Sequence, residues 1–374
     1  MHETTTSETL IDVESAAAAT IAEAAITDPR VDREGRACRV ALEIAPLLAS
    51  LTLDEQGRPS FAGEPVAPVD PGAFGEPAAA DDRAAALQQL TFAIYARFHC
   101  NDPSDASQRS ASTTSAAQWA QRTHAYQAAN IGRDRWDPGW VVEGVEPDGS
   151  VRVAKGDRRR RELPGRFASQ DPTRPWLNPG DTVSVASPAS STTVQPGFFF
   201  LLGQRPGSAD DEHRIARVYW NLEADGAQPW IAATSGALQR AGLPFRAKVL
   251  LDPGAFNRCD SAVLYLARRH FEACLPLVRE IATEVGEWLG ERTPPFTLRL
   301  APGVAVAEDP GESFGINRAR LIAQGLLTAH SAGESIDPIQ AVVESFTNAG
   351  LDPQRPYLNP GNLDRYQRHA NPDL

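Results

Sequence analysis

The sequence predicts an α+β protein, with a mainly helical N-terminal region at residues 1–135 and a core of mixed or antiparallel sheet with packed helices at residues 136–374. Three observations support this class. Alanine-rich segments with helical spacing of apolar residues fill the first region. The composition changes at Trp136, after which short β-branched and aromatic runs alternate with longer amphipathic segments. These strand-like runs are spaced too irregularly for a repeated strand–helix–strand series.

Three helical segments are expected in the N-terminal region. Apolar residues recur at helical spacing within residues 10–50, at residues 81–98 and at residues 116–130. The proline- and glycine-rich residues 58–77 predict a loop or linker. The serine- and threonine-rich residues 104–115 predict a polar loop.

The core begins with a predicted β-hairpin. The turn signal Pro-Asp-Gly at residues 147–149 separates strand-like runs at residues 141–145 and 150–153. Further strands are expected at residues 181–185 and 197–202. Beyond residue 213 the pattern predicts strands at 214–222, 245–251, 261–267 and 296–301, and helices at 227–241, 270–290, 313–330 and 336–349.

The bulk composition excludes several classes of protein. The net charge of −12 and the isoelectric point near 5.1 argue against a nucleic-acid or anionic-membrane partner. The 4 cysteines show neither zinc spacing nor a disulfide framework, so no metal or other cofactor is expected. The N-terminus lacks a basic region, and no apolar run reaches about 18 residues. We therefore expect a cytoplasmic protein.

Lysine is the rarest basic residue in the chain. Of the 36 lysine and arginine residues only Lys155 and Lys248 are lysine, and Lys248 lies in the apolar, strand-like residues 243–251. A guanidinium cannot lose its proton in a protein, whereas a desolvated ammonium near other cations can do so and act as a base. Lys248 is therefore a candidate for proton chemistry. The alternative is a structural lysine whose stem packs on the sheet and whose head reaches solvent.

Strand alternation gathers polar side chains around Lys248. Arg217, Tyr219 and Asn221 share one face of their strand, and Arg246 and Lys248 share one face of the next. If the two strands are neighbours, all five side chains lie on one surface, without an acidic residue among them. This pattern favours a functional face, although a solvated polar face is common in antiparallel sheets.

Two further segments could extend this surface. Arg258 and Asp260 follow a turn and lead into an apolar strand that contains Tyr265.

His99 is interpreted as a packed or helix-end histidine, because no acidic partner is evident nearby. The arginine run at residues 158–161 indicates a solvated hairpin edge that could attract an acidic peptide.

Two arginines follow a glycine- and acid-bearing loop expected at residues 301–313. Arg318 and Arg320 lie in the first turns of the next helix, whose expected N-cap is Ser313. A helix N-terminus with two arginines predicts a phosphate or oxyanion site. For Arg320 the alternative is a surface ion pair with one of the two acidic residues at 308–309.

These segments, in this order, resemble the HopA-like protein family. The resemblance covers residues 140–362 and is densest after residue 217. Its motifs are Arg-Val-Tyr-Trp-Asn at 217–221, Pro-Phe-Arg-Ala-Lys-Val at 244–249, Arg-Cys-Asp at 258–260, Ala-Glu-Asp-Pro at 307–310 and Arg-Pro-Tyr-Leu-Asn-Pro-Gly at 355–361. The family includes a type III effector of plant-pathogenic bacteria and the lyase subunits of class V lanthipeptide and thioamitide biosynthesis.

The resemblance implies a phosphoserine/phosphothreonine lyase that makes dehydroalanine and dehydrobutyrine in a ribosomal precursor peptide. The expected partners are the phosphorylated precursor peptide and a separate kinase-like phosphotransferase. A cyclase could be a third partner. A looser resemblance to the OspF-type phosphothreonine lyases implies Lys248 as base and Arg258 as phosphate ligand. Tyr219 stands where that family has its histidine acid. The expected catalytic residues are therefore Lys248, Tyr219 and Asp260, of which Asp260 is the carboxylate.

The substrate-binding residues that complete this assignment are Arg217, Asn221, Arg246, Tyr265, Arg318 and Arg320. The main alternative is a noncatalytic protein, either an effector or a leader-peptide scaffold, whose arginines only dock a phosphorylated partner. A phosphatase is less favoured, because no metal triad or Cys-x5-Arg loop is visible in the sequence.

Overall fold

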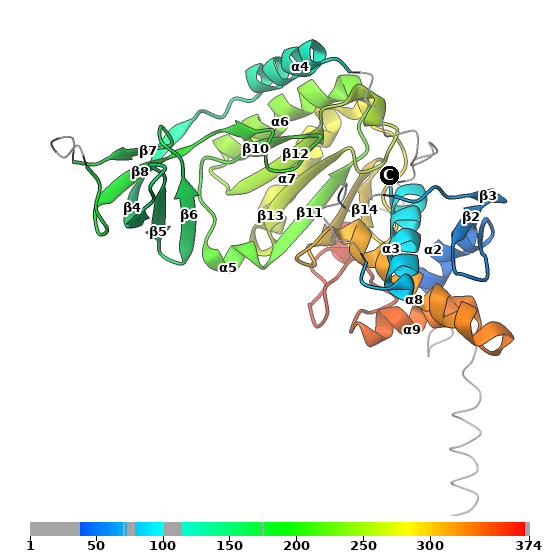
Figure 1. Cartoon of the computed structure of the whole chain (residues 1–374). Helices are drawn as coiled ribbons and strands as arrows, with labels where there is room; N and C mark the ends of the chain where they lie inside the picture. The colour runs from blue at the N-terminus through cyan, green and yellow to red at the C-terminus, as the bar shows by residue number, and fades with distance from the viewer. Residues whose placement is uncertain are drawn as a thin grey trace, which may run out of the picture.

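The computed structural model describes residues 38–69, 72, 79–100, 114–171, 173 and 176–370. Its centre is a seven-stranded antiparallel sheet with helices on both faces, and a five-stranded sheet lies to one side of it (Figure 1). The predicted α+β class is confirmed. None of the described helices combines the length and the apolar character that a membrane span requires.

The central sheet has the strand order β14-β15-β11-β13-β12-β10-β9, and every pair is antiparallel. Its strands are β9 (Ser190–Ser191), β10 (Phe198–Leu202), β11 (Ile215–Trp220), β12 (Phe245–Leu250), β13 (Ala262–Ala267), β14 (Leu298–Ala301) and β15 (Val304–Glu308). The four strands predicted beyond residue 213 are all present. However, β13 lies between β11 and β12, so the expectation that the two polar strands are direct neighbours is wrong.

Strand β15 replaces part of the loop expected at residues 301–313. All five of its residues are buried, and it pairs with both β11 and β14. The turn into it requires glycine, because Gly303 has φ +65° and an added Cβ would lie 2.2 Å from the carbonyl oxygen of Gly290. A short apolar run that is buried on both faces lacks the alternation by which strands are recognised, and this explains the error.

One face of the central sheet is apolar and is covered by α6 (Ala227–Arg240) and α7 (Phe271–Glu284) (Figure 1). Trp220 of β11 and Trp230 of α6 are both fully buried, and their ring centroids are 6.1 Å apart in an edge arrangement. Ala216 and Val218 point to the same side and are also fully buried. The predicted division of β11 into an apolar and a polar face is therefore confirmed.

The other face is covered by helices only in part. Phe314 of α8 and His99 of the π-helical turn η2 both lie against Tyr219, with ring centroids at 6.1 Å and 6.3 Å. On β12, farther along the sheet, Lys248 is half-buried and Arg246 is exposed. The helices of this layer are α2 (Arg39–Leu48), α3 (Asp82–Ile94), η2 (Tyr95–His99), α8 (Phe314–Ala332) and α9 (Pro338–Asn348).

The five-stranded sheet has a core of its own. Trp140, Val142 and Val153 belong to its buried apolar cluster, which is separate from the cluster around the central sheet. Its order β6-β5-β4-β8-β7 includes the predicted hairpin and places the arginine run on a solvated edge strand, as expected. Its strands are β4 (Arg135–Val145), β5 (Val151–Lys155), β6 (Arg158–Glu162), β7 (Phe167–Ser169) and β8 (Thr182–Ser187).

The N-terminal helices pack against the central sheet. Val40 of α2 and Leu90 of α3 lie in the same buried cluster as its strands. The helices expected at residues 81–98 and 116–130 are present as α3 with η2 and as α4 (Ala116–Ala129). Residues 1–37 and 101–113 lie outside the described residues, so most of the segment expected at 10–50 and the loop expected at 104–115 cannot be compared. The division at residue 135 stays a prediction.

Part of the loop expected at residues 58–77 is sheet instead. Strands β1 (Leu51–Leu53), β2 (Pro59–Phe61) and β3 (Glu64–Pro65) form a small antiparallel sheet. Gly57 and Gly63, both with positive φ, lie in its two turns. The same glycines and prolines that indicate a linker therefore make short hairpins here.

Candidate functional site

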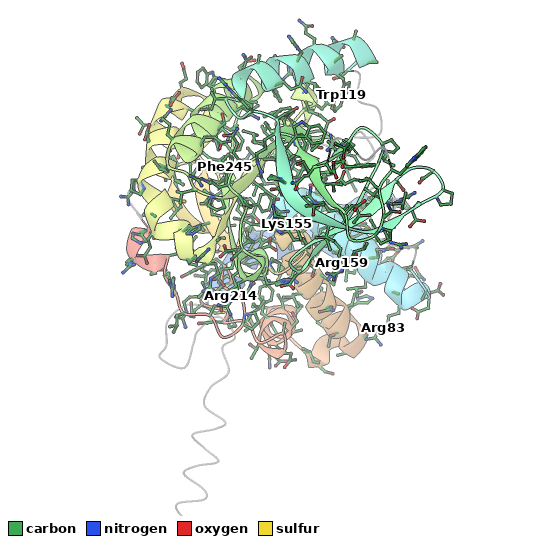
Figure 2. The ribbon with its side chains drawn as sticks, turned by 90° about the vertical axis from the view of Figure 1, so that its left-hand side faces the viewer. Arg83, Trp119, Lys155, Arg159, Arg214 and Phe245 are labelled. Atoms are coloured by element: carbon green, nitrogen blue, oxygen red, sulfur yellow. The ribbon has the colours of Figure 1, made fainter. Side chains whose placement is uncertain are left out.

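Lys248 lies on the polar face of β12 without an acidic partner. Its Nζ donates a hydrogen bond to Oε1 of Gln195 at 2.8 Å and lies 4.2 Å from the ring centroid of Phe198. No ion pair involves Lys248 within the described residues. The other lysine, Lys155, lies on β5 of the five-stranded sheet (Figure 2). Its Nζ pairs with Asp137 at 2.7 Å. Of the two lysines, only Lys155 is held in an ion pair, whereas Lys248 is not paired but helps to lower the pKa of the Asp260 carboxyl.

A tyrosine between two arginines forms the next row of the same face. Tyr265 on β13 is the direct cross-strand partner of both Arg217 and Arg246. The guanidinium carbons of these arginines lie 5.4 Å and 5.7 Å from the ring centroid of Tyr265, within cation–π range. Tyr265 points to the polar face because its chain neighbours Leu264 and Leu266 point to the buried one. The sequence indicated each residue but not the row they form.

The two arginines of this row differ in how far they are neutralised. Nη2 of Arg217 donates to Oδ1 of Asp309 at 2.8 Å and to the carbonyl oxygen of Glu312 at 2.6 Å. The expectation of a face without acidic residues is therefore wrong, because the loop after β15 brings Asp309 to it. Arg246 is exposed and has no ion pair among the described residues. Of the two arginines in this row, Arg246 is thus the more available to an incoming anion.

Tyr219 lies deeper on the same face, with 3% of its surface exposed. Its hydroxyl and the Nε of Arg217 are both buried, and neither makes a well-directed hydrogen bond within the described structure. Burial raises the pKa of Tyr219 well above its ordinary value, although Arg217 opposes this shift. The nearby cations therefore do not make this phenol more acidic, because desolvation of the phenolate outweighs their attraction, and this contradicts the expected role of Tyr219 as the acid.

Arg258 and Asp260 form a nearly buried ion pair beside Tyr95. Nε and Nη2 of Arg258 donate to the two carboxylate oxygens of Asp260 at 2.5 Å and 2.8 Å, and Nη2 also donates to the Tyr95 hydroxyl at 2.9 Å. Burial raises the pKa of Asp260, but the Arg258 guanidinium outweighs burial and leaves this pKa at about 2. Asp260 is therefore ionised at neutral pH, where it orients Arg258 and cannot donate a proton.

The side chains of Asn221 and Arg320 are both bound to other groups of the protein. Strand β11 ends at Trp220, and the Asn221 side chain donates to the carbonyl oxygen of Arg292 at 3.0 Å, away from the polar face. Arg320 donates to both carboxylate oxygens of Glu312 at 3.0 Å and 2.9 Å. Arg320 therefore forms an ion pair, as the alternative interpretation predicted. Its partner is Glu312, however, and not one of the two acidic residues at 308–309.

Arg318 is a buried structural residue. Only 2% of its surface is exposed, and it donates to the carbonyl oxygens of Pro356 at 2.9 Å and Leu358 at 3.2 Å. Burial lowers the pKa of Arg318 to about 10. Arg318 thus fixes the C-terminal segment against α8. The three arginines expected to bind phosphate, Arg258, Arg318 and Arg320, do not form one open anion site. The expected N-cap of α8 is confirmed, since the Ser313 side chain accepts from the Ile316 amide.

The π-helical turn η2 beside this site was not expected from the sequence. The Tyr95 and His99 rings stack at 5.5 Å. Burial lowers the pKa of His99 to about 4, so this histidine is neutral and packed, as the sequence analysis favoured. Its close contact with α8 requires glycine at position 315, where an added Cβ would lie 2.3 Å from the His99 ring. A π-helical turn is frequent at functional sites, but it leaves no local sequence mark.

Metal ligands do not gather in the part of the chain that the structure describes, where no group of three or more histidine, cysteine, aspartate and glutamate residues could hold an ion. Lys248, Tyr265 and Arg246 line the accessible part of the sheet face, and Arg217 and Tyr219 lie behind them.

The part of the chain that forms the central sheet is similar to a known protein family. Residues 189–358 match the HopA1 effector protein family, and this segment contains every strand of the central sheet. The match begins later than the resemblance from residue 140, so it leaves out the whole five-stranded sheet, whose last strand ends at Ser187. No curated protein matches the chain.

Two solved effector structures are similar to this chain. The effector protein from Pseudomonas syringae pv. tomato strain DC3000 is 16% identical, with 67% of this chain and 84% of that chain covered and a TM-score of 0.39. The effector protein from Pseudomonas syringae pv. syringae strain 61 is 17% identical, with 73% and 98% covered and a TM-score of 0.41.

Proposed function

We propose that the protein is a lyase that eliminates phosphate from phosphoserine and phosphothreonine of a peptide, with Lys248 as the base. The observation that carries this proposal is the position of Lys248, an ammonium without a carboxylate partner that lies one row from the arginine-flanked Tyr265. Arg246 and Lys248 are two residues apart on one face of β12, which separates them by roughly 7 Å along the strand. A phosphorylated side chain can lie between them.

In the proposed reaction the Lys248 amine removes the Cα proton of the phosphorylated residue. The electron pair forms the Cα–Cβ double bond, the Cβ–O bond breaks, and phosphate leaves with the bonding electrons. The products are the dehydroamino acid, phosphate and a protonated Lys248. Arg246 holds the departing phosphate, and Arg217 adds positive charge from the other side of Tyr265. Fixed donors aimed at the developing charge stabilise the transition state more than the ground state.

Protonation of the leaving group is not assigned to Tyr219. Its raised pKa makes it a weak proton donor, and 3% exposure keeps it from direct contact with a peptide. Phosphate departs as an anion that the guanidinium groups neutralise. Tyr219 then serves as part of the wall beneath Arg217.

The substrate in this proposal is a precursor peptide that another enzyme has phosphorylated, because elimination consumes a phosphoester and cannot make one. A kinase-like phosphotransferase must therefore act first. The resemblance to lyase subunits of lanthipeptide and thioamitide biosynthesis supports a ribosomal peptide as substrate, and a cyclase could use the dehydroamino acids afterwards.

Mass spectrometry of a phosphoserine peptide incubated with the protein tests this function. We expect loss of phosphoric acid with the native chain and none with Lys248→Ala. Lys155→Ala is the matched control, because Lys155 is bound to Asp137 on the other sheet. The exposed Arg246 beside Tyr265 equally favours a noncatalytic phosphopeptide-docking protein. Tight binding of the phosphopeptide by the native chain without any mass loss would select that second function.

A further inference from the structure

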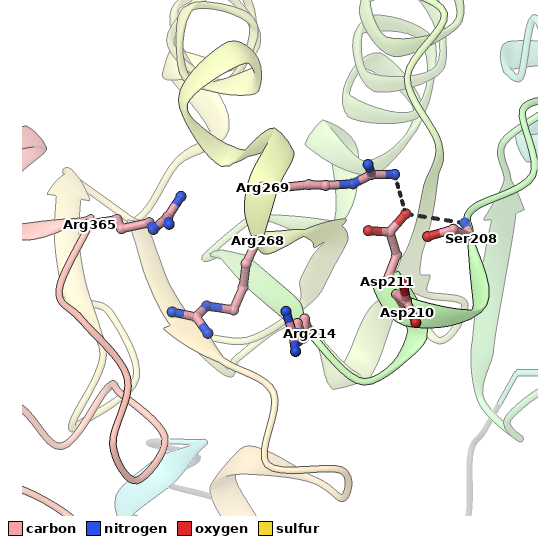
Figure 3. Close-up of a pocket in the computed structure, with 7 residues that line it drawn as sticks. All are labelled: Ser208, Asp210, Asp211, Arg214, Arg268, Arg269 and Arg365. Carbon is pink, nitrogen blue, oxygen red and sulfur yellow. Dashed lines mark hydrogen bonds and ion pairs between the residues drawn. The ribbon is translucent and has the colours of Figure 1, made fainter.

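A pocket rich in arginine lies at one end of the central sheet, outside the proposed elimination site. Its volume is about 260 Å³, and the side chains around it come from the start of β11, the end of β13, the short helix α5 (Ala209–Glu212) and the C-terminal segment (Figure 3). The charged residues that line it are Asp210, Asp211, Arg214, Arg268, Arg269 and Arg365.

Two of the four arginines are neutralised by carboxylates. Nη2 of Arg269 lies 2.7 Å from Oδ2 of Asp211, and Nε of Arg268 lies 2.6 Å from Oε1 of the fully buried Glu308. Arg214 and Arg365 are exposed, and neither side chain has a hydrogen bond or an ion pair with another described residue. In a chain of net charge −12, two such cations on the rim of one pocket call for an explanation.

The helix beside the pocket makes this concentration of positive charge costly. Arg268 and Arg269 directly precede α7, and its N-cap His270 makes no side-chain capping hydrogen bond. The N-terminus of a helix carries partial positive charge, so cations placed there are destabilising and an anion is stabilising. A bound anion would satisfy both the arginines and the helix end.

The pocket lies on the side of the sheet opposite to Lys248. Glu308, which holds Arg268, is the cross-strand partner of Ala216, and Ala216 belongs to the apolar face of β11. The polar face of β11 instead carries Arg217. An anion in the pocket therefore neither touches the proposed base nor competes with its substrate.

We propose that this pocket is a second anion site, which binds a phosphate group through Arg214 and Arg365 with Arg268 and Arg269 behind them. A phosphate has several oxygens that can accept paired N–H donors from more than one guanidinium at once. The pocket volume admits the phosphate group, and its opening leaves room for whatever carries it. The carrier is either free orthophosphate or the phosphorylated side chain of a peptide.

Calorimetric titration of orthophosphate at constant ionic strength tests this site. The titration uses the full chain with Arg246→Gln, which weakens anion binding at the other sheet face. We expect binding by this variant and at least about a tenfold rise in Kd when Arg214→Gln and Arg365→Gln are added, since charge-assisted contacts are lost. Both arginines are exposed, so thermal melting should be unchanged. Absence of binding, or equal Kd values for the two variants, would overturn the proposal.

A second variant tests the same site by strengthening it. Asp210 lines the pocket, and its carboxylate repels an incoming anion. In the Arg246→Gln background, Asp210→Asn should lower the Kd for orthophosphate several-fold, and an unchanged or higher Kd would count against the site. A phosphoserine peptide that binds more tightly than orthophosphate assigns the pocket to a phosphorylated side chain, and equal affinity assigns it to free phosphate. Equal binding of the unphosphorylated peptide would refute phosphate recognition.

Discussion

Replacing Asp260 with asparagine should destabilise the fold strongly, because the change leaves the Arg258 guanidinium buried without its counter-charge. The side chains of this pair are only 12% and 9% exposed, and two hydrogen bonds join them. In the variant, Arg258 keeps its hydrogen bond to the Tyr95 hydroxyl. Breaking one side of a buried ion pair costs about 3–5 kcal/mol. We expect a loss of this size in the free energy of unfolding.

The same pair predicts a dependence of stability on pH. The pKa of Asp260 is about 2 in the folded chain, against about 3.9 for an unperturbed aspartate. A lowered pKa adds stability that is fully present above the unfolded value and is lost as the pH falls through the folded value. The contribution is therefore nearly complete above about pH 4, is lost as the pH falls through about 2, and amounts to roughly 2–3 kcal/mol. Asp260→Asn should remove this part of the acid sensitivity.

Urea denaturation of the native and variant chains at pH 7 and pH 3 measures both effects. The matched control is Glu280→Gln, which breaks the exposed pair of Arg240 and Glu280 at 3.7 Å and should cost less than about 1 kcal/mol. A loss below about 1 kcal/mol for Asp260→Asn would refute the view that this pair is a buried anchor of the site.

Three further predictions concern the sheet face. Lys248→Arg keeps the charge but cannot accept a proton, so phosphate release measured by mass spectrometry should stop; a rate near that of the native chain would contradict the role of base. Tyr219→Phe should leave the single-turnover rate of elimination within about twofold of the native rate. The melting temperature should be equal or slightly higher, because the change removes a buried hydroxyl without a well-directed partner. A large drop in rate would restore Tyr219 as the acid. Arg246→Gln should weaken phosphopeptide binding by about 1.5–3 kcal/mol, whereas Arg320→Gln should not, because Arg320 is bound to Glu312; equal losses in a titration would contradict the different roles of these arginines.

Local patterns in the sequence determine most elements of the core and the face that each side chain takes. The strands predicted at 214–222, 245–251 and 261–267 appear as β11, β12 and β13, with small differences at their ends. Helical and strand periodicities are properties of consecutive residues, so they can be recognised without the rest of the fold. The same alternation correctly assigned Arg217 and Tyr219 to one face and Trp220 to the other.

The composition of the candidate site depends on which strands are neighbours. Strand β13 lies between β11 and β12, and its register sets Tyr265 against both Arg217 and Arg246. No local pattern contains this order, because strand pairing joins residues far apart in the chain. The Asp309 contact that neutralises Arg217 likewise spans 92 residues.

Whether an arginine binds a ligand or supports the fold was also decided by tertiary contacts. Arg318 and Arg320 are two positions apart on one helix, yet Arg318 is buried against the carbonyls of residues 356–358 and Arg320 pairs with Glu312 near the surface. The sequence alone determined that the chain has many arginines, two lysines and an α+β pattern. Only the tertiary structure decided which cations are neutralised, because burial and ion pairing depend on segments that the fold brings together.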